Sequence, residues 1–260
     1  MTPAQAQLLI DHLPSDVIRD RIAAGWTTII VPLGATEQHG PALPLIVDNE
    51  HGLHTALRAA ARLGRTLVGP VMTLGYSPEH ARFAGTVSLS RATVSGLLHD
   101  IAESHARSGF RLVYFWVAHG GNFGVLKDVL PALRDKWAGC KVAGLEDIAG
   151  YVASTWDRVP PEHGVPLSAS GSHAGEFETS IMLAIRPDLV KMDRAAAGNP
   201  APLDVVYDRM MRDGIDAVSP NGVLGDQRPA DARRGHAYLD ALADYVANDV
   251  RRHLAAVEAK

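Results

Sequence analysis

The chain has 260 residues, of which 47% are hydrophobic and 21% are charged. This length and composition predict one globular domain over residues 1–260, and they exclude a disordered chain. The formal net charge of −4 gives no electrostatic reason to expect a nucleic acid or a membrane surface as a partner.

The N-terminal segment, MTPAQAQLLIDHLPSDVIRD, is polar and becomes acidic early, so it does not resemble a signal peptide. No apolar run along the chain approaches the roughly 20 residues that a membrane span requires. Cys140 is the single cysteine, which excludes an intramolecular disulfide and a cluster of thiolate ligands. We therefore expect a cytoplasmic protein in a reducing compartment.

Short β-branched segments alternate with longer amphipathic segments along the chain. The predicted order is a strand at 27–34, a helix at 49–64, a strand at 66–71, a helix at 91–109, a strand at 111–119 and a helix at about 123–137. A strand at 140–146 and helices at about 173–185 and about 231–256 follow. Residues 155–172 and 195–228 interrupt this pattern as loop-rich stretches. The alternation predicts an α/β fold with a mainly parallel sheet that helices cover on both faces.

This fold class predicts where a functional site should lie. In open α/β sheets, ligands bind at the carboxyl ends of the strands. The segment GATEQHGPALPLIVDNE, residues 34–50, follows the first strand, and the segment HGGN, residues 119–122, follows the strand at 111–119. Two strand ends therefore bring histidines and carboxylates to the same edge of the sheet. No glycine-rich phosphate-binding motif follows the first strand, so a nucleotide cofactor has little support.

Four residues in these two segments form a candidate metal site. Glu37 and His39 are two positions apart, so in an extended segment both side chains point to the same side. Asp48 can fold back beside them, and His119 comes from the other strand end. Two carboxylates and two imidazoles suit zinc, manganese or iron(II), and Asp48 is the candidate to bridge two ions. The alternative is that the Glu-x-His pair is solvated surface and that the glycines of HGGN only turn the chain.

A third segment, SGSHAGEFETS at residues 170–180, offers candidates for proton transfer. His173 and Glu176 are three residues apart at the start of a predicted helix, so they share a face and could act as general acid and base. The alternative is that Glu176 and Glu178 only favour a helix N-terminus through the helix dipole, which fits Glu178 best. His80, in the segment SPEH, could line the same pocket, whereas Trp116 is expected in the core.

Five segments, in chain order, resemble the motifs of the creatininase (creatinine amidohydrolase) family. The segment PLGATEQHGPALPL, with Asp48 after it, resembles the first motif, and HGGN and HAGEFETS resemble two later ones. GYSPEHARFAGTVSLS, residues 75–90, and GVLGDQRPADARRG, residues 222–235, resemble two more. The resemblance extends from about residue 31 to residue 235, which is nearly the whole chain.

The resemblance implies a three-layer α/β/α fold and a divalent-metal-dependent amidohydrolase. Such an enzyme cleaves a C–N bond of a small cyclic amide or formamide through a metal-activated water, with two ions of Zn²⁺, Mn²⁺ or Fe²⁺. Glu37 and His119 would hold one ion, His39 the other, and Asp48 would bridge them. His173 matches a family histidine that acts as an acid or base, with Glu176 as a second proton carrier. The resemblance also implies a homo-oligomer, often a hexamer.

Several positions depart from the creatinine-cleaving pattern and so concern the substrate. A glutamate ligand of those enzymes is replaced by Gly121, and Glu176 is the candidate to fill the gap. The other departures are Ala42, Ile46-Val47, Val117-Ala118 and Ser172. Together they argue against creatinine itself as the substrate. Two alternatives stay open: a non-catalytic member that binds a metal or ligand on the same fold, and a formylaminopyrimidine deformylase.

Overall fold

Four parallel strands form the central sheet in the part of the chain that the computed structural model describes, residues 2–258. The strands are β1 (Thr28–Leu33), β2 (Thr66–Val68), β3 (Leu112–Val117) and β4 (Lys141–Gly144). They lie in the order β2-β1-β3-β4, and every neighbouring pair is parallel. β1 and β3 are buried along their whole length, which explains their continuous apolar sequence.

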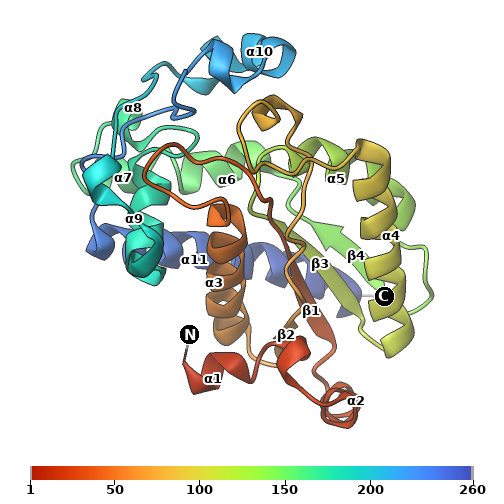
Figure 1. Cartoon of the computed structure of the whole chain (residues 1–260). Helices are drawn as coiled ribbons and strands as arrows, with labels where there is room; N and C mark the ends of the chain where they lie inside the picture. The colour runs from red at the N-terminus through yellow and green to blue at the C-terminus, as the bar shows by residue number, and fades with distance from the viewer. Residues whose placement is uncertain (1, 259–260) are drawn as a thin grey trace.

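Helices cover both faces of this sheet (Figure 1). The helices α3 (Val47–Leu63), α9 (Glu176–Ile185) and α11 (Ala232–Glu258) pack together as one layer, in which α3 contacts β1 and α11 contacts β3. The helices α4 (Arg91–Ser108) and α5 (Asn122–Leu133) form the layer on the opposite face. The predicted three-layer α/β/α fold with a parallel sheet is therefore confirmed.

Shorter elements connect these layers. The remaining helices are α1 (Pro3–Ala6), α2 (Ser15–Ala23), α6 (Ile148–Ser154), α7 (Val159–Glu162), α8 (Leu167–Ser170) and α10 (Leu203–Asp213). The 3₁₀ turns are η1 (Ile10–His12), η2 (Pro78–His80), η3 (Pro187–Leu189), η4 (Met192–Arg194) and η5 (Ile215–Ala217).

Three sequence-based boundaries were wrong. The stretches expected as loops contain α7, α8 and α10; α7 and α8 have only four residues each, too few to show a helical pattern, and α10 buries only Val206 and Met210. The helix expected from residue 173 begins at Glu176, because Ala174 adopts a φ of 54° and Gly175 is extended. β2 ends at Val68 rather than at residue 71, since its ladder with β1 ends there.

One hydrophobic core joins the ends of the chain to the sheet. It contains residues from Leu9 near the N-terminus to Val250 in α11. Trp116 of β3 is fully buried, so its expected place in the core is confirmed. Near it in the same strand, the hydroxyl of Tyr114 donates a hydrogen bond to Asp249 of α11 and so links the sheet to that helix.

The strand order creates a switch point between β1 and β3. The connection from β1 leads through α3 to β2 on one side, whereas β3 and β4 continue the sheet on the other side. Leu33 at the end of β1 pairs with Val117 at the end of β3, so the two following loops start side by side. Such a switch point is where open α/β sheets bind ligands, and it is the place where the candidate residues lie.

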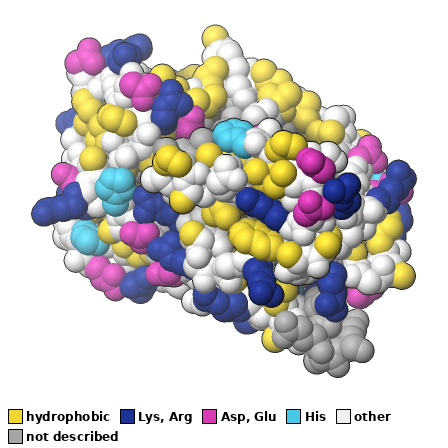
Figure 2. Space-filling model, turned by 90° about the horizontal axis from the view of Figure 1, so that it is seen from below, with side chains coloured by type: hydrophobic (Ala, Val, Ile, Leu, Met, Phe, Trp, Pro, Cys, Tyr) yellow, Lys and Arg dark blue, Asp and Glu magenta, His cyan; other side chains and the backbone are white. Residues whose placement is uncertain are grey.

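The face at the opposite end of the molecule carries a mixed surface. Figure 2 shows this face, where acidic, basic and hydrophobic side chains are interspersed and no large region of one charge is seen. Among the described residues, no helix has both the length and the apolar character that crossing a membrane requires.

Candidate metal centre

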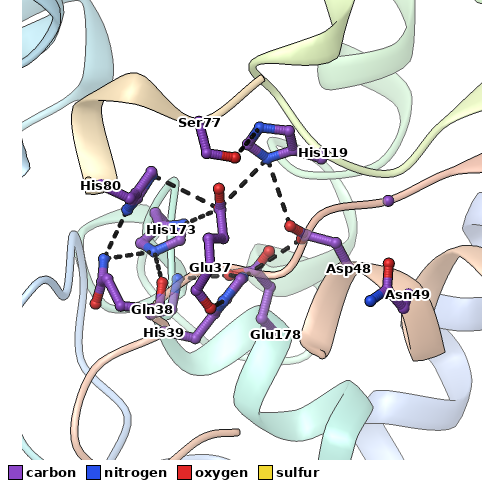
Figure 3. Close-up of polar contacts among 12 residues, drawn as sticks. Glu37, Gln38, His39, Asp48, Asn49, Ser77, His80, His119, His173 and Glu178 are labelled. Atoms are coloured by element: carbon purple, nitrogen blue, oxygen red, sulfur yellow. Dashed lines mark hydrogen bonds and ion pairs between the residues drawn. The ribbon is translucent and has the colours of Figure 1, made fainter. Parts of the chain in front are cut away.

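The four predicted metal ligands come together in the structure. Glu37 and His39 lie on the loop after β1, Asp48 lies in the first turn of α3, and His119 follows β3 (Figure 3). His119 Nδ1 is 3.3 Å from Glu37 Oε1 and 3.4 Å from Asp48 Oδ2. His39 Nε2 is 3.4 Å from Asp48 Oδ1. Asp48 therefore turns one carboxylate oxygen toward each histidine.

Two groups of possible ligand atoms share Asp48. The first group is Glu37, Asp48 and His119, and the second is His39, Asp48 and Glu178, with the atoms of each group within 4.8 Å of one another. Glu178 Oε2 lies 3.9 Å from His39 Nε2. A carboxylate shared by two such groups is the arrangement that a bridged pair of divalent ions requires.

Unpaired buried atoms in this cluster fit a metal site. Glu37 Oε2, His39 Nε2 and Asp48 Oδ2 are buried and have no hydrogen-bond partner. Burying such atoms without a partner costs about 1–3 kcal/mol each, and more for charged groups. A bound cation would remove this cost, and imidazole with carboxylate is a donor set that zinc and manganese accept.

Backbone carbonyls fix the orientation of both histidine ligands. His39 Nδ1 lies 3.1 Å from the carbonyl oxygen of Glu37, and His119 Nε2 lies 2.9 Å from that of Tyr76. A carbonyl only accepts, so these nitrogens carry the ring hydrogens. In the neutral form of each ring, which metal binding requires, His39 Nε2 and His119 Nδ1 then carry the lone pairs, and these face the carboxylates.

The charges of the cluster shift one another's pKa values. Burial alone would lower the pKa of His39, but Asp48 beside it raises that pKa to about 10. Burial alone would raise the pKa of Asp48, but His39 lowers it to about 2. Burial raises the pKa of Glu178 to about 7 despite the opposing effect of His39. The carboxylates of Glu37, Asp48 and Glu178 lie close together in a buried space, so the electrostatic potential there is negative and attracts cations.

Glu176, expected near the second ion, does not join this cluster. Its carboxylate is fully buried and accepts hydrogen bonds from Arg234 Nε at 2.8 Å, the Tyr238 hydroxyl at 2.9 Å and the Ser180 hydroxyl at 2.6 Å. Ser180 lies on α9 itself, and Arg234 and Tyr238 lie on α11. Glu178 takes the position beside His39 instead, because two residues along a helix rotate a side chain by about 200°.

His173, the predicted acid or base, borders the cluster. Its backbone pairs with Leu224, which holds the segment before α9 in place. His173 Nδ1 is 3.7 Å from Glu37 Oε1, and His173 Nε2 is 2.8 Å from the carbonyl oxygen of Gln38. Burial, reinforced by His39 and His80, lowers the pKa of His173 well below its usual value. A neutral imidazole beside the cluster is suited to accept a proton.

A cavity of about 860 Å³ opens from the cluster. Glu37, Asp48, His119, His173 and Glu178 lie in its wall, and so does His80. Four exposed apolar side chains also line the cavity, and we call them the apolar mouth: Ile148, Leu167, Leu203 and Tyr207. The cavity therefore combines a polar, buried end with an apolar, open end.

Further polar groups, beyond the candidate ligands and His173, also line or support the site. Ser170 and Ser172 line the cavity with hydroxyls that have no partner. Glu79 also lines it, and burial raises the pKa of its carboxyl to about 7. The Ser77 hydroxyl lies 3.0 Å from His119 Nε2. These residues come from the motif-like segments at 75–90 and 170–180. The sequence singled out Ser172 as a departure from the creatinine-cleaving pattern, and for the others the segment was the only signal.

Gly121, the position at which the resemblance to creatinine-cleaving enzymes implies a glutamate ligand, has no room for a side chain. A Cβ atom there would come within 2.0 Å of the Tyr76 carbonyl oxygen and 2.5 Å of His119 Nε2. The loop after β3 therefore approaches the Tyr76 segment too closely for a ligand at this position. The acid that does approach the cluster is Glu178, which lies beside His39.

A parallel α/β/α protein with a buried histidine–carboxylate cluster at its switch point is typical of the metal-dependent hydrolases. The comparison with known families is specific: residues 12–250 match the creatininase family, described as creatinine amidohydrolase. The chain belongs to the creatininase family. The predicted family and the predicted class of enzyme, a hydrolase of C–N bonds, are thereby confirmed.

Two relatives illustrate the functions named within this family. The chain is 36% identical over 239 residues to a mycofactocin precursor peptide peptidase of Mycobacterium tuberculosis, covering 86% of this chain and 85% of that protein. It is 33% identical over 244 residues to a creatinine amidohydrolase of Pseudomonas putida, covering 89% of this chain and 91% of that protein.

Solved creatininase structures share the fold of this chain, and the titles of some of them state which metal is bound. One, titled as a manganese creatininase, is 29% identical with a TM-score of 0.76 and covers 95% of this chain and 98% of its own. Another, a mutant creatininase of zinc–zinc type, is 28% identical with a TM-score of 0.74 and the same coverage. These titles, with the buried ligand groups of this chain, make a metal-binding site plausible.

Proposed function

We propose that this chain is an amidohydrolase that depends on two divalent metal ions. Glu37, Asp48 and His119 would hold one ion, and His39, Asp48 and Glu178 would hold the other. The observation that carries this assignment is Asp48, whose two oxygens each lie 3.4 Å from the ligand nitrogen of a different histidine. Zinc, manganese and iron(II) all accept this donor set.

The ions would supply Lewis acidity toward the amide carbonyl and make water more acidic. The residues of the chain do the remaining work. His173 lies at the edge of the cluster with Nδ1 toward Glu37, so it can take a proton from water and give it to the departing nitrogen. The unpartnered hydroxyls of Ser170 and Ser172 can hold polar groups of the substrate. Burial of the whole cluster excludes bulk water and strengthens each of these interactions.

The first candidate substrate is a small cyclic amide or a formamide other than creatinine. Its amide would lie at the buried end of the cavity, next to the cluster. A formylaminopyrimidine belongs to this class and is one specific form of the proposal.

The second candidate substrate is an amide bond of a short peptide. The observation that favours it is the size of the cavity, about 860 Å³, together with its apolar mouth. This space exceeds what a single small ring fills, and apolar side chains at the mouth can contact residues next to the cleaved bond. A relative of comparable identity is named as a peptide peptidase, which supports the same class.

One experiment separates these functions. The full chain, loaded with zinc or manganese, is incubated with lactams, a formylaminopyrimidine, other formamides and short peptides that end in apolar residues, and the products are identified by mass spectrometry. Turnover that requires the metal and disappears in Asp48→Asn supports the proposal. A protein that binds two equivalents of metal and cleaves none of these substrates would instead be a non-catalytic binding member of the family.

We also propose that residues 1–260 act as one hydrolase domain, which the shared core from Leu9 to Val250 supports. The homo-oligomer implied by the resemblance remains a proposal as well, and light scattering of the purified chain measures it.

A further inference from the structure

The side-chain amide of Gln38 has an orientation that two backbone groups determine. Gln38 Oε1 accepts a hydrogen bond from the Gly40 amide at 2.9 Å, and Gln38 Nε2 donates one to the Gly222 carbonyl at 3.2 Å. If the amide were turned over, its NH₂ group would face the Gly40 N–H and its oxygen would face the carbonyl. Both contacts would be repulsive, so the fold itself fixes which end of the buried amide is the donor.

This donor determines the hydrogen position on His80. Gln38 Nε2 lies 2.9 Å from His80 Nδ1, and because the amide nitrogen only donates, His80 Nδ1 must accept. The ring hydrogen of His80 then sits on Nε2. That nitrogen faces two carboxylates, with Glu37 Oε1 at 3.6 Å and Glu79 Oε1 at 3.7 Å. His80 thereby presents an N–H to the proposed metal ligand Glu37 (Figure 3).

The backbone of Gln38 does the same for His173. His173 Nε2 lies 2.8 Å from the Gln38 carbonyl oxygen, which can only accept, so this nitrogen carries a hydrogen. His173 Nδ1 is therefore the atom that faces the cluster. The 3.0 Å contact between Gln38 Nε2 and His173 Nε2 joins two nitrogens whose hydrogens point to other acceptors.

We propose that Gln38 is a positioning residue that places the hydrogens of two site histidines. Its side chain sets the hydrogen of His80 on Nε2, toward Glu37, and its carbonyl sets that of His173 on Nε2, away from the cluster. The consequence for hydrolysis rests on the proposed function, because it assumes that Glu37 holds an ion and that His173 moves a proton. The hydrogen positions themselves do not depend on any activity.

Histidine-labelled protein tests the hydrogen positions directly. The ¹⁵N chemical shifts of the full chain, with and without zinc, distinguish the two forms of a neutral imidazole. We expect both His80 and His173 to carry hydrogen on Nε2. In Gln38→Leu, His80 loses its donor and should become a mixture of both forms, whereas His173 keeps the backbone carbonyl and should not change.

Gln227 offers a matched control. It is also a buried glutamine of this site, but its amide binds only backbone groups, with Nε2 3.0 Å from the His39 carbonyl oxygen and Oε1 accepting from Ala196. Gln227→Leu should leave the hydrogen position on His80 unchanged. Gln38→Met, which keeps the length of the side chain, repeats the test if Gln38→Leu does not fold.

Kinetics give the second measurement. Residues that orient metal ligands typically change activity by about 10- to 100-fold, so Gln38→Leu should lower kcat by about 10-fold or more. KM and the zinc content should change little, since the cavity wall and the ligands are kept. A wild-type His80 with its hydrogen on Nδ1 would overturn the proposal, and so would a Gln38→Leu variant in which the form of His80 does not change.

Discussion

Glu176 and Glu178 lie two positions apart on α9, and their carboxylates belong to different parts of the molecule. Glu176 is enclosed by Arg234, Tyr238 and Ser180, whereas Glu178 approaches His39 of the proposed metal centre. The same helix therefore uses one acid to attach itself to α11 and places the next one at the site.

This difference predicts opposite effects of two identical substitutions. Glu178→Gln removes a proposed ligand, so the bound zinc should fall from about two equivalents to about one, while the melting temperature of the metal-free protein changes little. Glu176→Gln leaves Arg234 without its charged partner in a buried network and should lower the free energy of unfolding by about 1–3 kcal/mol. Its zinc content should stay at about two equivalents. Elemental analysis and thermal unfolding measure both; equal zinc content in both variants would contradict the assignment of Glu178.

Substitution of the bridging residue should affect both ions. Asp48→Asn keeps the shape of the side chain but removes its charge, so we expect less than one equivalent of zinc and a loss of activity of at least about 100-fold. Asp249→Asn is the matched control, since Asp249 is also buried but binds Tyr114 away from the site. The control should lose stability and keep its zinc. Calorimetric titration with zinc separates the two cases.

Removal of the metal should lower both activity and stability. A chelator leaves the unpaired atoms of Glu37, His39 and Asp48 buried without a partner, so the metal-free protein should unfold at a lower temperature. At a free metal concentration 100 times the dissociation constant, one bound ion adds about 2.7 kcal/mol. Scanning calorimetry before and after chelation measures this difference. Zinc or manganese should restore it, and a melting temperature that does not respond to metal would argue against the site.

His173→Ala should separate proton transfer from metal binding. The variant removes a group next to the cluster but no proposed ligand, so two equivalents of zinc should remain bound. General acid–base catalysis contributes about 10²- to 10⁴-fold, and kcat should fall within this range. His105→Ala serves as the control and should keep full activity, because it removes a ring of α4 that packs on Phe110 away from the site. Unchanged activity of His173→Ala on a metal-dependent substrate would exclude the proposed role.

Two adjacent glycines allow a direct test of the packing around His119. A Cβ at Gly121 meets the Tyr76 carbonyl oxygen and His119, whereas a Cβ at Gly120 meets no atom within 4 Å. Gly121→Ala should therefore displace the histidine, weaken zinc binding and cost about 1–3 kcal/mol of stability. Gly120→Ala should change neither property by more than experimental error. Zinc affinity and chemical denaturation of the two variants measure the contrast.

The layers of the fold could be predicted from local sequence, because β1 and β3 are continuous apolar runs and α3 and α11 have clear helical patterns. The short helices α7, α8 and α10 could not. α7 and α8 have only four residues each, too few to show a helical period. α10 is amphipathic, but it buries only Val206 and Met210 and lies in a segment interrupted by prolines and glycines.

Within the candidate site, residues that follow strand ends were predictable, and residues on α9 were not. Glu37, His39 and His119 follow the carboxyl ends of β1 and β3, so predicting the two strands is enough to predict that these residues lie together. The choice between Glu176 and Glu178 depends on the rotation of α9, which starts only after the turn at Ala174. A change of the helix start by two or three residues reverses which acid faces the site, and the sequence does not specify the start that closely.

The pairing of β1 with β3 has a consequence for how this family can diversify. Adjacent parallel strands are held about 4.8 Å apart by their hydrogen bonds, so the ladder that ends at Leu33 and Val117 sets the separation of the two ligand-bearing loops. The side chains of the apolar mouth belong to α6, α8 and α10, and these three helices lie outside the sheet. Substitutions there can change which amide is accepted while the spacing between the proposed ions stays the same.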